Sequence, residues 1–429
     1  MKVFLLSLGC SKNQVDSEMI AGVLKRGGHH LVSTSDEADA ALVNTCGFIA
    51  PAVEESVDAI LDLEILKRSG KLKFLGIVGC LVNRYEKELR EEIPSADLFA
   101  RTGDIFAVAE AMNNGRFSPG RAQLPGMPSW TRYLKISEGC NNRCSYCTIP
   151  SIRGPLASAP PADLYREVEQ LVSEGAREIC LVAQDLTAYG LDLGTKVDLA
   201  GLIDGMEDRF RGEDLWFRLL YLHPGRVGRS LVEKVASSRL FLNYLDLPVQ
   251  HADPDILKAM NRGRSEGDKA LDLFAFARSL DPGFALRTTI MVGFPGEDDR
   301  RFQRLLEFLE SARIDRVGVF PFSPEEGTAA AEMEDQVDEE IKMERLERIV
   351  SLQEGISLQR QKLFEGEVIR VLVDEFDPEE GYIEGRSYRE APEVDGVVEA
   401  STHAPVSTGE FVMVRVLEAM EHDLVGEVV

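Results

Sequence analysis

The sequence contains no long apolar run. No stretch approaches the roughly 18 to 20 apolar residues that a membrane-spanning helix requires, so we expect no membrane partner. The opening MKVFLLSLGC turns polar after about seven apolar positions, fewer than the core of a signal peptide usually holds. We therefore expect a buried first strand here, and a cytoplasmic protein.

Basic residues are also scarce. Lys and Arg number 48 against 73 Asp and Glu, which gives a formal net charge of -25. A field of this sign disfavours non-specific binding to nucleic acid and favours a basic protein partner. With 44% hydrophobic and 28% charged residues, the composition is that of a globular protein, and 429 residues indicate two to four domains.

Cysteines are few and odd in number, which argues against a disulfide framework in a chain without an export signal. Metal binding or catalysis is the alternative. The seven positions are Cys10, Cys46, Cys80, Cys140, Cys144, Cys147 and Cys180.

Three of these cysteines follow a repeated pattern in the first hundred residues. Apolar runs over 2–8, 40–44 and 74–78 alternate with helical patterns over 15–26, 52–67 and 86–92, which predicts a parallel sheet covered by helices. Cys10, Cys46 and Cys80 each lie just past the end of one strand. Because open α/β sheets bind ligands at this edge, we expect the three cysteines to converge.

The rest of the chain indicates two further domains. Residues 113–130, rich in Asn, Gly and Pro, are typical of a linker. Six strand-like runs at 133–137, 178–184, 216–222, 244–249, 286–294 and 316–322 predict a partial (β/α)6 barrel, whose chemistry is expected at the carboxyl ends of the strands. A charged amphipathic pattern over 337–363 predicts a helix, interpreted as a solvated outer face or a spacer.

Five short strand-like runs at 367–376, 381–388, 394–400, 411–419 and 424–429 predict a small closed barrel of the OB type. Residues 360–429 hold six Lys or Arg against seventeen Asp or Glu, so this barrel is acidic. The predicted fold class is α/β: an N-terminal parallel sheet domain over 1–116, a partial barrel over 126–356 and a five-stranded β-barrel over 359–429.

A second group of cysteines, Cys140, Cys144 and Cys147, forms CNNRCSYC after the first barrel strand. A 4Fe-4S cube normally takes four thiolates, and three leave one iron open to another ligand. Structural zinc, which prefers four tetrahedral ligands, and an electron carrier with fully ligated clusters are the alternatives. Cys180 lies in an apolar run and is expected in the core, and His223 and His251 are expected to be hydrogen-bonded structural residues.

The CxxxCxxC pattern with Tyr146 before its last cysteine resembles the signature of the radical S-adenosylmethionine enzymes. With three N-terminal cysteines and a terminal β-barrel, the whole chain resembles the methylthiotransferase family, whose terminal barrel is a TRAM domain. SLGCSKNQVDSE and GRSYREAPEVDG are similar to the RimO-type branch, which modifies an aspartate of ribosomal protein twelve of the small subunit. Members often have Pro where this chain has Ser11. The tRNA adenosine branch is the alternative.

The resemblance implies a transferase that uses two 4Fe-4S clusters, two molecules of S-adenosylmethionine and an electron donor. Cys140, Cys144 and Cys147 would bind the cluster that cleaves S-adenosylmethionine to a radical, which attacks the β-carbon of the aspartate. Cys10, Cys46 and Cys80 would bind the cluster that carries the sulfur. The N-terminal sheet is then expected to dock its carboxyl edge over the barrel mouth, since reacting atoms must approach closely.

Five further residues are candidates for contacting S-adenosylmethionine. The resemblance places Tyr146 near the adenine, and Gln184 and Asp185, at a strand end, near the methionine or ribose portion. Gly293 matches a position of close backbone approach, and Arg264 is a candidate partner for the carboxylate. A packing role, a simple turn and a surface ion pair are the alternatives for Tyr146, Gly293 and Arg264.

Overall fold

The computed structural model describes all 429 residues, which divide into two compact units. The N-terminal unit comprises Met1–Met127, Glu138–Asn142 and Cys147–Leu156, and the C-terminal unit comprises Pro128–Ser137, Arg143–Tyr146 and Ala157–Val429. No helix is both long enough and apolar enough to cross a membrane. The division into domains over 1–116, 126–356 and 359–429 stays a prediction.

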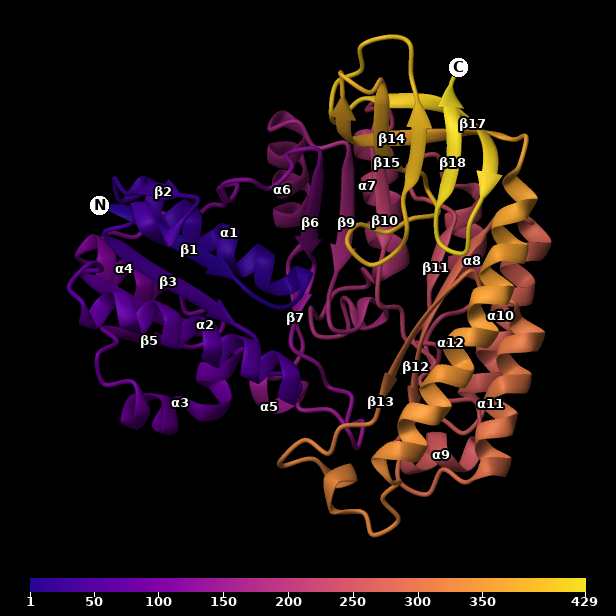
Figure 1. The fold of residues 1–429 in the computed structure, drawn as a ribbon, viewed down its shortest axis with the longest axis horizontal. Helices are drawn as coiled ribbons and strands as arrows, with labels where there is room; N and C mark the ends of the chain where they lie inside the picture. Colours follow the sequence, from indigo (N-terminus) through magenta and orange to yellow (C-terminus); the bar gives the residue numbers. More distant parts are fainter. The chain divides into compact units, whose positions relative to one another are not determined.

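A five-stranded parallel sheet forms the centre of the N-terminal unit (Figure 1). Its order is β2-β1-β3-β4-β5, so the three predicted strands are its three central ones. The outer strands β2 and β5 have three residues each, which is too short for hydrophobic periodicity to predict them. The bounds are β1 (Lys2–Ser7), β2 (His30–Val32), β3 (Ala40–Thr45), β4 (Phe74–Gly79) and β5 (Leu98–Ala100).

Helices cover both faces of this sheet. Ile20 and Leu24 of α1 and Met112 of α4 pack on one face, and Ile60 of α2 and Leu89 of α3 pack on the other. The α helices are α1 (Ser11–Arg26), α2 (Ala50–Arg68), α3 (Cys80–Glu92), α4 (Ile105–Asn113) and α5 (Ile149–Arg153), and Ser35–Glu37 forms a 3-10 turn. Burial on both faces explains why the strands read as continuous apolar runs.

The predicted linker has no helix or strand beyond Asn113, but it is packed against the N-terminal unit. Arg121 pairs with Glu18 of α1 at 2.6 Å, and both side chains are almost fully buried. Arg26 donates from Nε to the carbonyl of Ser118 at 2.8 Å. The segment up to Met127 is therefore fixed along α1, and its loop-like composition does not predict this packing.

Six parallel strands form the first part of the C-terminal unit. They make two ladders, β10-β9-β6 and β11-β12-β13, which an isolated parallel bridge between Phe217 and Phe241 links. The bounds are β6 (Thr131–Lys135), β9 (Glu178–Val182), β10 (Trp216–Leu219), β11 (Tyr244–Asp246), β12 (Ala285–Val292) and β13 (Arg316–Pro321). All six predicted strands are present.

Helices between the strands complete the partial barrel (Figure 1). Their bounds are α6 (Pro161–Ser173), α7 (Leu199–Phe210), α8 (Arg229–Ser237), α9 (Pro254–Ala259), α10 (Glu266–Leu280) and α11 (Asp299–Ala312). Short elements are β7 (Ser137–Glu138), β8 (Ala157–Ser158) and the 3-10 turns Leu186–Ala188 and Ala329–Glu332. The apolar faces of the longer helices pack against residues of the strands, and together they form one hydrophobic core.

The long helix α12 (Glu339–Gln361) corrects the expectation of a spacer. Its Ile349 is fully buried in the barrel core. Gln353 donates to the carbonyl of Ile314 at 2.8 Å, and Ser357 donates to that of Asp315 at 2.9 Å. The helix therefore packs along the last barrel strand, and some of its charged residues, Lys342, Arg345 and Arg360, are themselves buried.

The last five strands close into a small barrel in the order β14-β15-β16-β18-β17, as predicted. All neighbouring strands are antiparallel except the parallel pair β16 and β18. The 3-10 turn Lys362–Phe364 precedes them, and the bounds are β14 (Val368–Asp377), β15 (Tyr382–Arg386), β16 (Val398–Ser401), β17 (Phe411–Ala419) and β18 (Leu424–Val428).

The GRSYREAPEVDG segment fastens this small barrel to the amino ends of the partial-barrel strands. Arg386 forms an ion pair with Glu178, the first residue of β9. Arg389 pairs with Asp315 at 3.2 Å, and Asp395 accepts a hydrogen bond from Tyr244, the first residue of β11, at 2.6 Å. The segment thus lies opposite the strand ends at which chemistry is expected.

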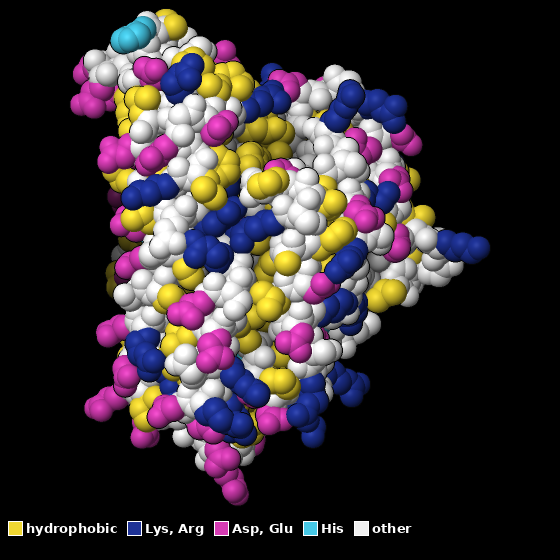
Figure 2. All heavy atoms as spheres, turned by 90° about the vertical axis from the view of Figure 1, so that its right-hand side faces the viewer, with side chains coloured by type: hydrophobic (Ala, Val, Ile, Leu, Met, Phe, Trp, Pro, Cys, Tyr) yellow, Lys and Arg dark blue, Asp and Glu magenta, His cyan; other side chains and the backbone are white.

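The face that α10, α11 and α12 cover carries charges of both signs. Basic side chains gather near the middle of this view, with acidic ones scattered around them (Figure 2). The negative net charge is therefore not spread uniformly over the surface.

Candidate functional sites

The structure brings the three N-terminal cysteines to one edge of one sheet. Cys10 directly precedes α1, Cys46 directly follows β3, and Cys80 is the first residue of α3 after β4. Because β1, β3 and β4 are neighbours, all three cysteines lie at the carboxyl ends of adjacent parallel strands. This is the convergence that the sequence spacing predicts.

A glycine adjoins each of these cysteines and allows close packing. A Cβ at Gly9, whose φ is +88°, would lie 2.9 Å from the Cβ of Cys46. A Cβ at Gly47 would lie 2.9 Å from the carbonyl oxygen of Cys80, and one at Gly79, with φ of +100°, would clash with Asn44. Larger residues at these positions would force the three cysteine loops apart.

Asn13 connects the three loops. Its Nδ2 donates to the carbonyl of Leu8 at 2.8 Å and to the carbonyl of Thr45 at 3.0 Å, next to Cys10 and Cys46 along the chain. Its Oδ1 accepts from the thiol of Cys80 at 3.6 Å. One buried amide thus fixes the loops that carry all three cysteines.

The three thiols differ in their electrostatics. Burial raises the pKa of Cys46 to about 11, and burial also raises the pKa of Cys80. Cys10 is exposed, and although partial desolvation of its thiol opposes ionisation, Lys12, Arg153 and backbone N–H groups outweigh this effect and lower the pKa of Cys10. Because a metal binds the thiolate, Cys46 and Cys80 must lose protons when a metal or cluster loads.

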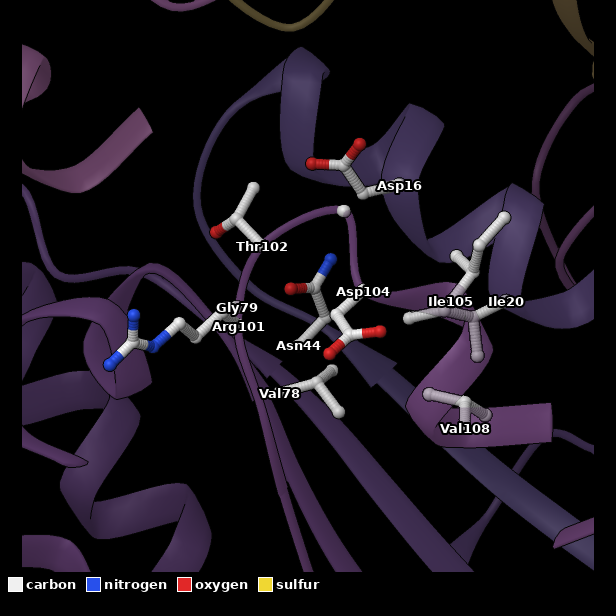
Figure 3. A pocket seen from close by; sticks show the side chains of 11 residues that line it. Asp16, Ile20, Asn44, Val78, Gly79, Arg101, Thr102, Asp104, Ile105 and Val108 are labelled. Carbon is white, nitrogen blue, oxygen red and sulfur yellow. The ribbon is translucent and has the colours of Figure 1, made fainter. Parts of the chain in front are cut away.

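A small pocket adjoins this edge (Figure 3). Asp16 of α1 and Asn44 of β3 line it, together with Thr102 on the loop after β5. Thr102 donates from Oγ1 to the sulfur of Cys80 at 3.6 Å. The pocket is therefore continuous with the surroundings of Cys80.

The CNNRCSYC cysteines fall in different units, Cys140 and Cys147 in the N-terminal one and Cys144 in the C-terminal one. In the N-terminal unit, the backbone N–H of Cys140 donates to the carbonyl of Gly154 at 3.1 Å. The sulfur of Cys140 accepts from the N–H of Asn142 at 3.4 Å. All three cysteines are half-buried.

In the C-terminal unit, the segment with Cys144 is tied to α9 and the loop after it. Ser145 donates its N–H to the carbonyl of Met260 at 3.0 Å, and Asn261 donates to the carbonyl of Arg143 at 2.6 Å. Tyr146 meets the ring of Phe294 edge-on at 6.5 Å. This aromatic contact at the carboxyl end of β12 is compatible with both packing and adenine contact.

Arg262 is a residue of this site that the sequence did not single out. Its side chain is only 4% exposed, pairs with Glu266 at 2.8 Å and donates to the carbonyl of Pro248 at 2.9 Å. Burial raises the pKa of Cys144, while the charge of Arg262 opposes that rise. Arg264, the arginine chosen from the sequence, is 57% exposed and pairs with Asp255 at 2.6 Å. Its contact with the cofactor stays a prediction.

The strand-end candidates are held by neighbours within the same unit. Asp185 is buried, accepts from the N–H of Thr187 at 3.0 Å and pairs with Arg226, and Gln184 precedes it at the end of β9. A Cβ at Gly293, with φ of +69°, would clash with Lys342 of α12. The packing of α12 is therefore sufficient to require glycine at this position.

Three residues outside the candidate set lie in the hydrogen-bonded or buried environments expected from the sequence. His251 is fully buried, accepts from the N–H of Asp253 at 2.9 Å and contacts Glu297 at 3.1 Å. His223 accepts from the N–H of Gly225 at 3.1 Å, and Cys180 is fully buried in β9. Cys180 therefore lies in the core, and hydrogen bonds hold both histidine rings.

No group of three or more His, Cys, Asp or Glu side chains converges as the ligands of a single metal ion do. In an iron-sulfur cube each thiolate binds a separate iron, so its ligands need not meet at one point. Thiols are the donors that such clusters require, and the glycine-lined edge brings three of them together. The N-terminal cysteine trio therefore fits a cluster.

The chain matches three family models. Residues 2–101 match the model described as Uncharacterized protein family UPF0004, residues 134–309 match the Radical SAM superfamily, and residues 366–429 match the TRAM domain. Among solved structures, TsrM of Kitasatospora setae, a radical S-adenosylmethionine methyltransferase, is similar with a TM-score of 0.56 and 13% identity over 74% of this chain and 72% of that chain. OxsB, a cobalamin-dependent S-adenosylmethionine radical enzyme, is similar with a TM-score of 0.51 and 12% identity over 82% and 56%. These two show the fold.

Full-length relatives are much more similar. The protein named ribosomal protein uS12 methylthiotransferase RimO from Desulforamulus reducens is 43% identical, with 99% of this chain and 98% of the relative covered. The proteins of the same name from Pelotomaculum thermopropionicum and Trichlorobacter lovleyi are 43% and 42% identical, each over 100% of this chain and at least 98% of the relative. The chain belongs to the RimO family of radical S-adenosylmethionine methylthiotransferases.

Proposed function

We propose that this enzyme attaches a methylthio group to the β-carbon of a specific aspartate in ribosomal protein uS12, the small-subunit protein twelve, in the cytoplasm. The observation that carries the proposal is the presence of two separate cysteine trios in a chain similar to RimO proteins from end to end. The relatives are named for this substrate.

Each trio would hold one 4Fe-4S cluster. Cys140, Cys144 and Cys147 would hold the cluster that would supply the electron for cleavage of S-adenosylmethionine, and Cys10, Cys46 and Cys80 would hold the cluster that would carry the sulfur to be methylated by a second S-adenosylmethionine. An external electron donor completes the requirement.

The chain's own residues prepare these two sites. Asn13 and the adjoining glycines hold the N-terminal segments together, which keeps the three cysteines at one edge of the sheet. Arg262 supplies a buried positive charge beside Cys144, which favours the thiolate. Tyr146, Gln184, Asp185, Arg264 and Gly293 remain the proposed contacts of S-adenosylmethionine.

The acidity of the chain supports a protein substrate over tRNA. Residues 360–429 contain seventeen acidic against six basic residues, and a tRNA phosphate backbone would be repelled by such a surface. Ribosomal proteins are generally basic and would be attracted.

The test is intact-mass analysis of uS12 from cells with and without this chain. We expect uS12 to be heavier by one methylthio group only when the chain is present, with fragmentation placing the group on an aspartate. An unchanged uS12 mass, together with loss of methylthio-adenosine from tRNA, would reassign the substrate to tRNA.

A further inference from the structure

Arg153, at the end of the short helix α5, has no role in the function proposed above. It follows Cys147 by six residues, yet α5 is fastened to the N-terminal sheet domain. Asn83 of α3 donates to the carbonyl of Ile152 at 2.6 Å, and Thr148 donates to the carbonyl of Phe48 at 3.3 Å. The N-terminal cysteine trio thus has a neighbour that comes from the second cysteine motif.

The guanidinium of Arg153 is buried and held in place by three side chains. Only 2% of the side chain is exposed. It pairs with Glu138 at 2.9 Å and with Asp16 at 3.3 Å, and it donates to Oδ1 of Asn13. Because several planar N–H groups are fixed by different partners, the charge cannot swing away into solvent.

This position is directly linked to the cysteines. The Asn13 oxygen that accepts from Arg153 also accepts from the thiol of Cys80, and the Asn13 amide bonds the ends of the loops before Cys10 and Cys46. A buried positive charge therefore faces the place where three thiolates must gather.

We propose that Arg153 is a positioning residue of the sulfur-carrying site, whose fixed charge retains an anionic sulfur ligand, hydrosulfide or polysulfide, beside Cys10, Cys46 and Cys80. The inference rests on the proposed function, because it assumes a cluster on this trio. Thiolates and hydrosulfide are all anions, and crowding them beside the buried Cys46 and Cys80 is costly without a nearby cation. The same charge favours the reduced state of such a cluster and raises its reduction potential.

The test uses the full chain with Cys144→Ser, reconstituted anaerobically, so that only the N-terminal trio holds a cluster. The first measurement is the midpoint potential from a titration followed by electron paramagnetic resonance. The second is the dissociation constant of sodium hydrosulfide from the spectral change of the cluster. We expect Arg153→Gln to lower the potential and to weaken hydrosulfide binding at least tenfold.

Two further variants separate charge from fold. Arg153→Lys keeps the charge but loses the planar fork, so it should recover most of the hydrosulfide affinity even if thermal stability falls as in Arg153→Gln. Glu138→Gln removes a partly exposed partner of Arg153 and should shift the potential upward, the opposite direction. Arg90→Gln, at an exposed ion pair with Glu86, is the matched control and should change neither quantity.

The outcomes are distinct. Unchanged potential and hydrosulfide affinity in Arg153→Gln, or an equal loss in Arg153→Lys, would overturn the role of Arg153 while leaving the proposed function intact. If Arg153→Gln does not fold, the upward shift in Glu138→Gln decides, and its absence would overturn the role. Failure of the parent chain to bind any cluster on the N-terminal trio would overturn both the inference and the two-cluster function.

Discussion

At the scale of single residues, the placement of the N-terminal cysteines was predictable and the side chains that support them were not. Cys10, Cys46 and Cys80 are visible because each ends a strand in a regular βα rhythm. Asn13, in the first turn of α1, and Arg262, in the loop after α9, act through buried hydrogen bonds and charge, which leave no periodic signal. The sequence pattern that indicates Arg264 does not separate an exposed arginine from the buried Arg262 two positions away.

Arg262 gives the first prediction. Arg262→Gln removes the buried charge beside Cys144 and leaves Glu266 unpaired, so we expect S-adenosylmethionine cleavage to fall at least tenfold. Cleavage is measured as methionine release by the reconstituted enzyme. Arg229→Gln, which breaks an exposed pair with Asp272, is the control and should stay within twofold of the unmodified chain. Equal rates in both variants would rule out a role for Arg262.

At the scale of elements, periodicity predicted the long strands and helices, and tertiary packing decided the rest. β12 and β13 are recognisable as apolar runs, whereas the three-residue strands β2 and β5 exist because a neighbouring strand pairs with them. The segment 114–127 lacks any period, yet the buried pair of Arg121 with Glu18 fixes it along α1. Such pairs join residues about a hundred positions apart and are invisible locally.

The segment between β15 and β16 gives the second prediction. Arg386→Ala would leave the fully buried carboxylate of Glu178 with Arg218 alone, which should cost about 3–5 kcal/mol of unfolding free energy. Urea unfolding followed by circular dichroism measures this loss. Replacing both partners, Arg386→Met with Glu178→Met, should cost less than the two single variants together, because only Arg218 then keeps a buried charge without its carboxylate. A double variant as unstable as the sum of the single ones would contradict the pairing.

The third prediction concerns pH at a second contact of this segment, the ion pair of Arg389 with Asp315. Burial opposes ionisation of Asp315, but Arg389, Arg360 and Arg278 outweigh it and hold its pKa below the ordinary value near 3.8. Because the folded-state pKa is depressed, the stabilisation is present above about pH 4 and is lost as the pH falls through the folded pKa. The melting temperature should therefore drop below pH 4, and less steeply in Asp315→Asn. Parallel pH profiles for the two proteins would contradict this assignment.

At the scale of the whole molecule, the acidic charge, the fold class and the order of the three parts were all predictable from the sequence. Composition and motif order can be read without a structure, because they depend on what the chain contains and not on how its loops pack. That both cysteine trios serve one substrate stays a prediction, as do the individual contacts with S-adenosylmethionine. They depend on loop conformations and bound groups that no local pattern encodes.

The most direct measurement of the central claim is the number of 4Fe-4S clusters per chain, from iron and sulfide content after anaerobic reconstitution. We predict two clusters in the unmodified chain and one in each of Cys46→Ser and Cys144→Ser, with S-adenosylmethionine cleavage surviving only in Cys46→Ser. A single cluster in the unmodified chain, or an undiminished count in Cys46→Ser, would contradict the account.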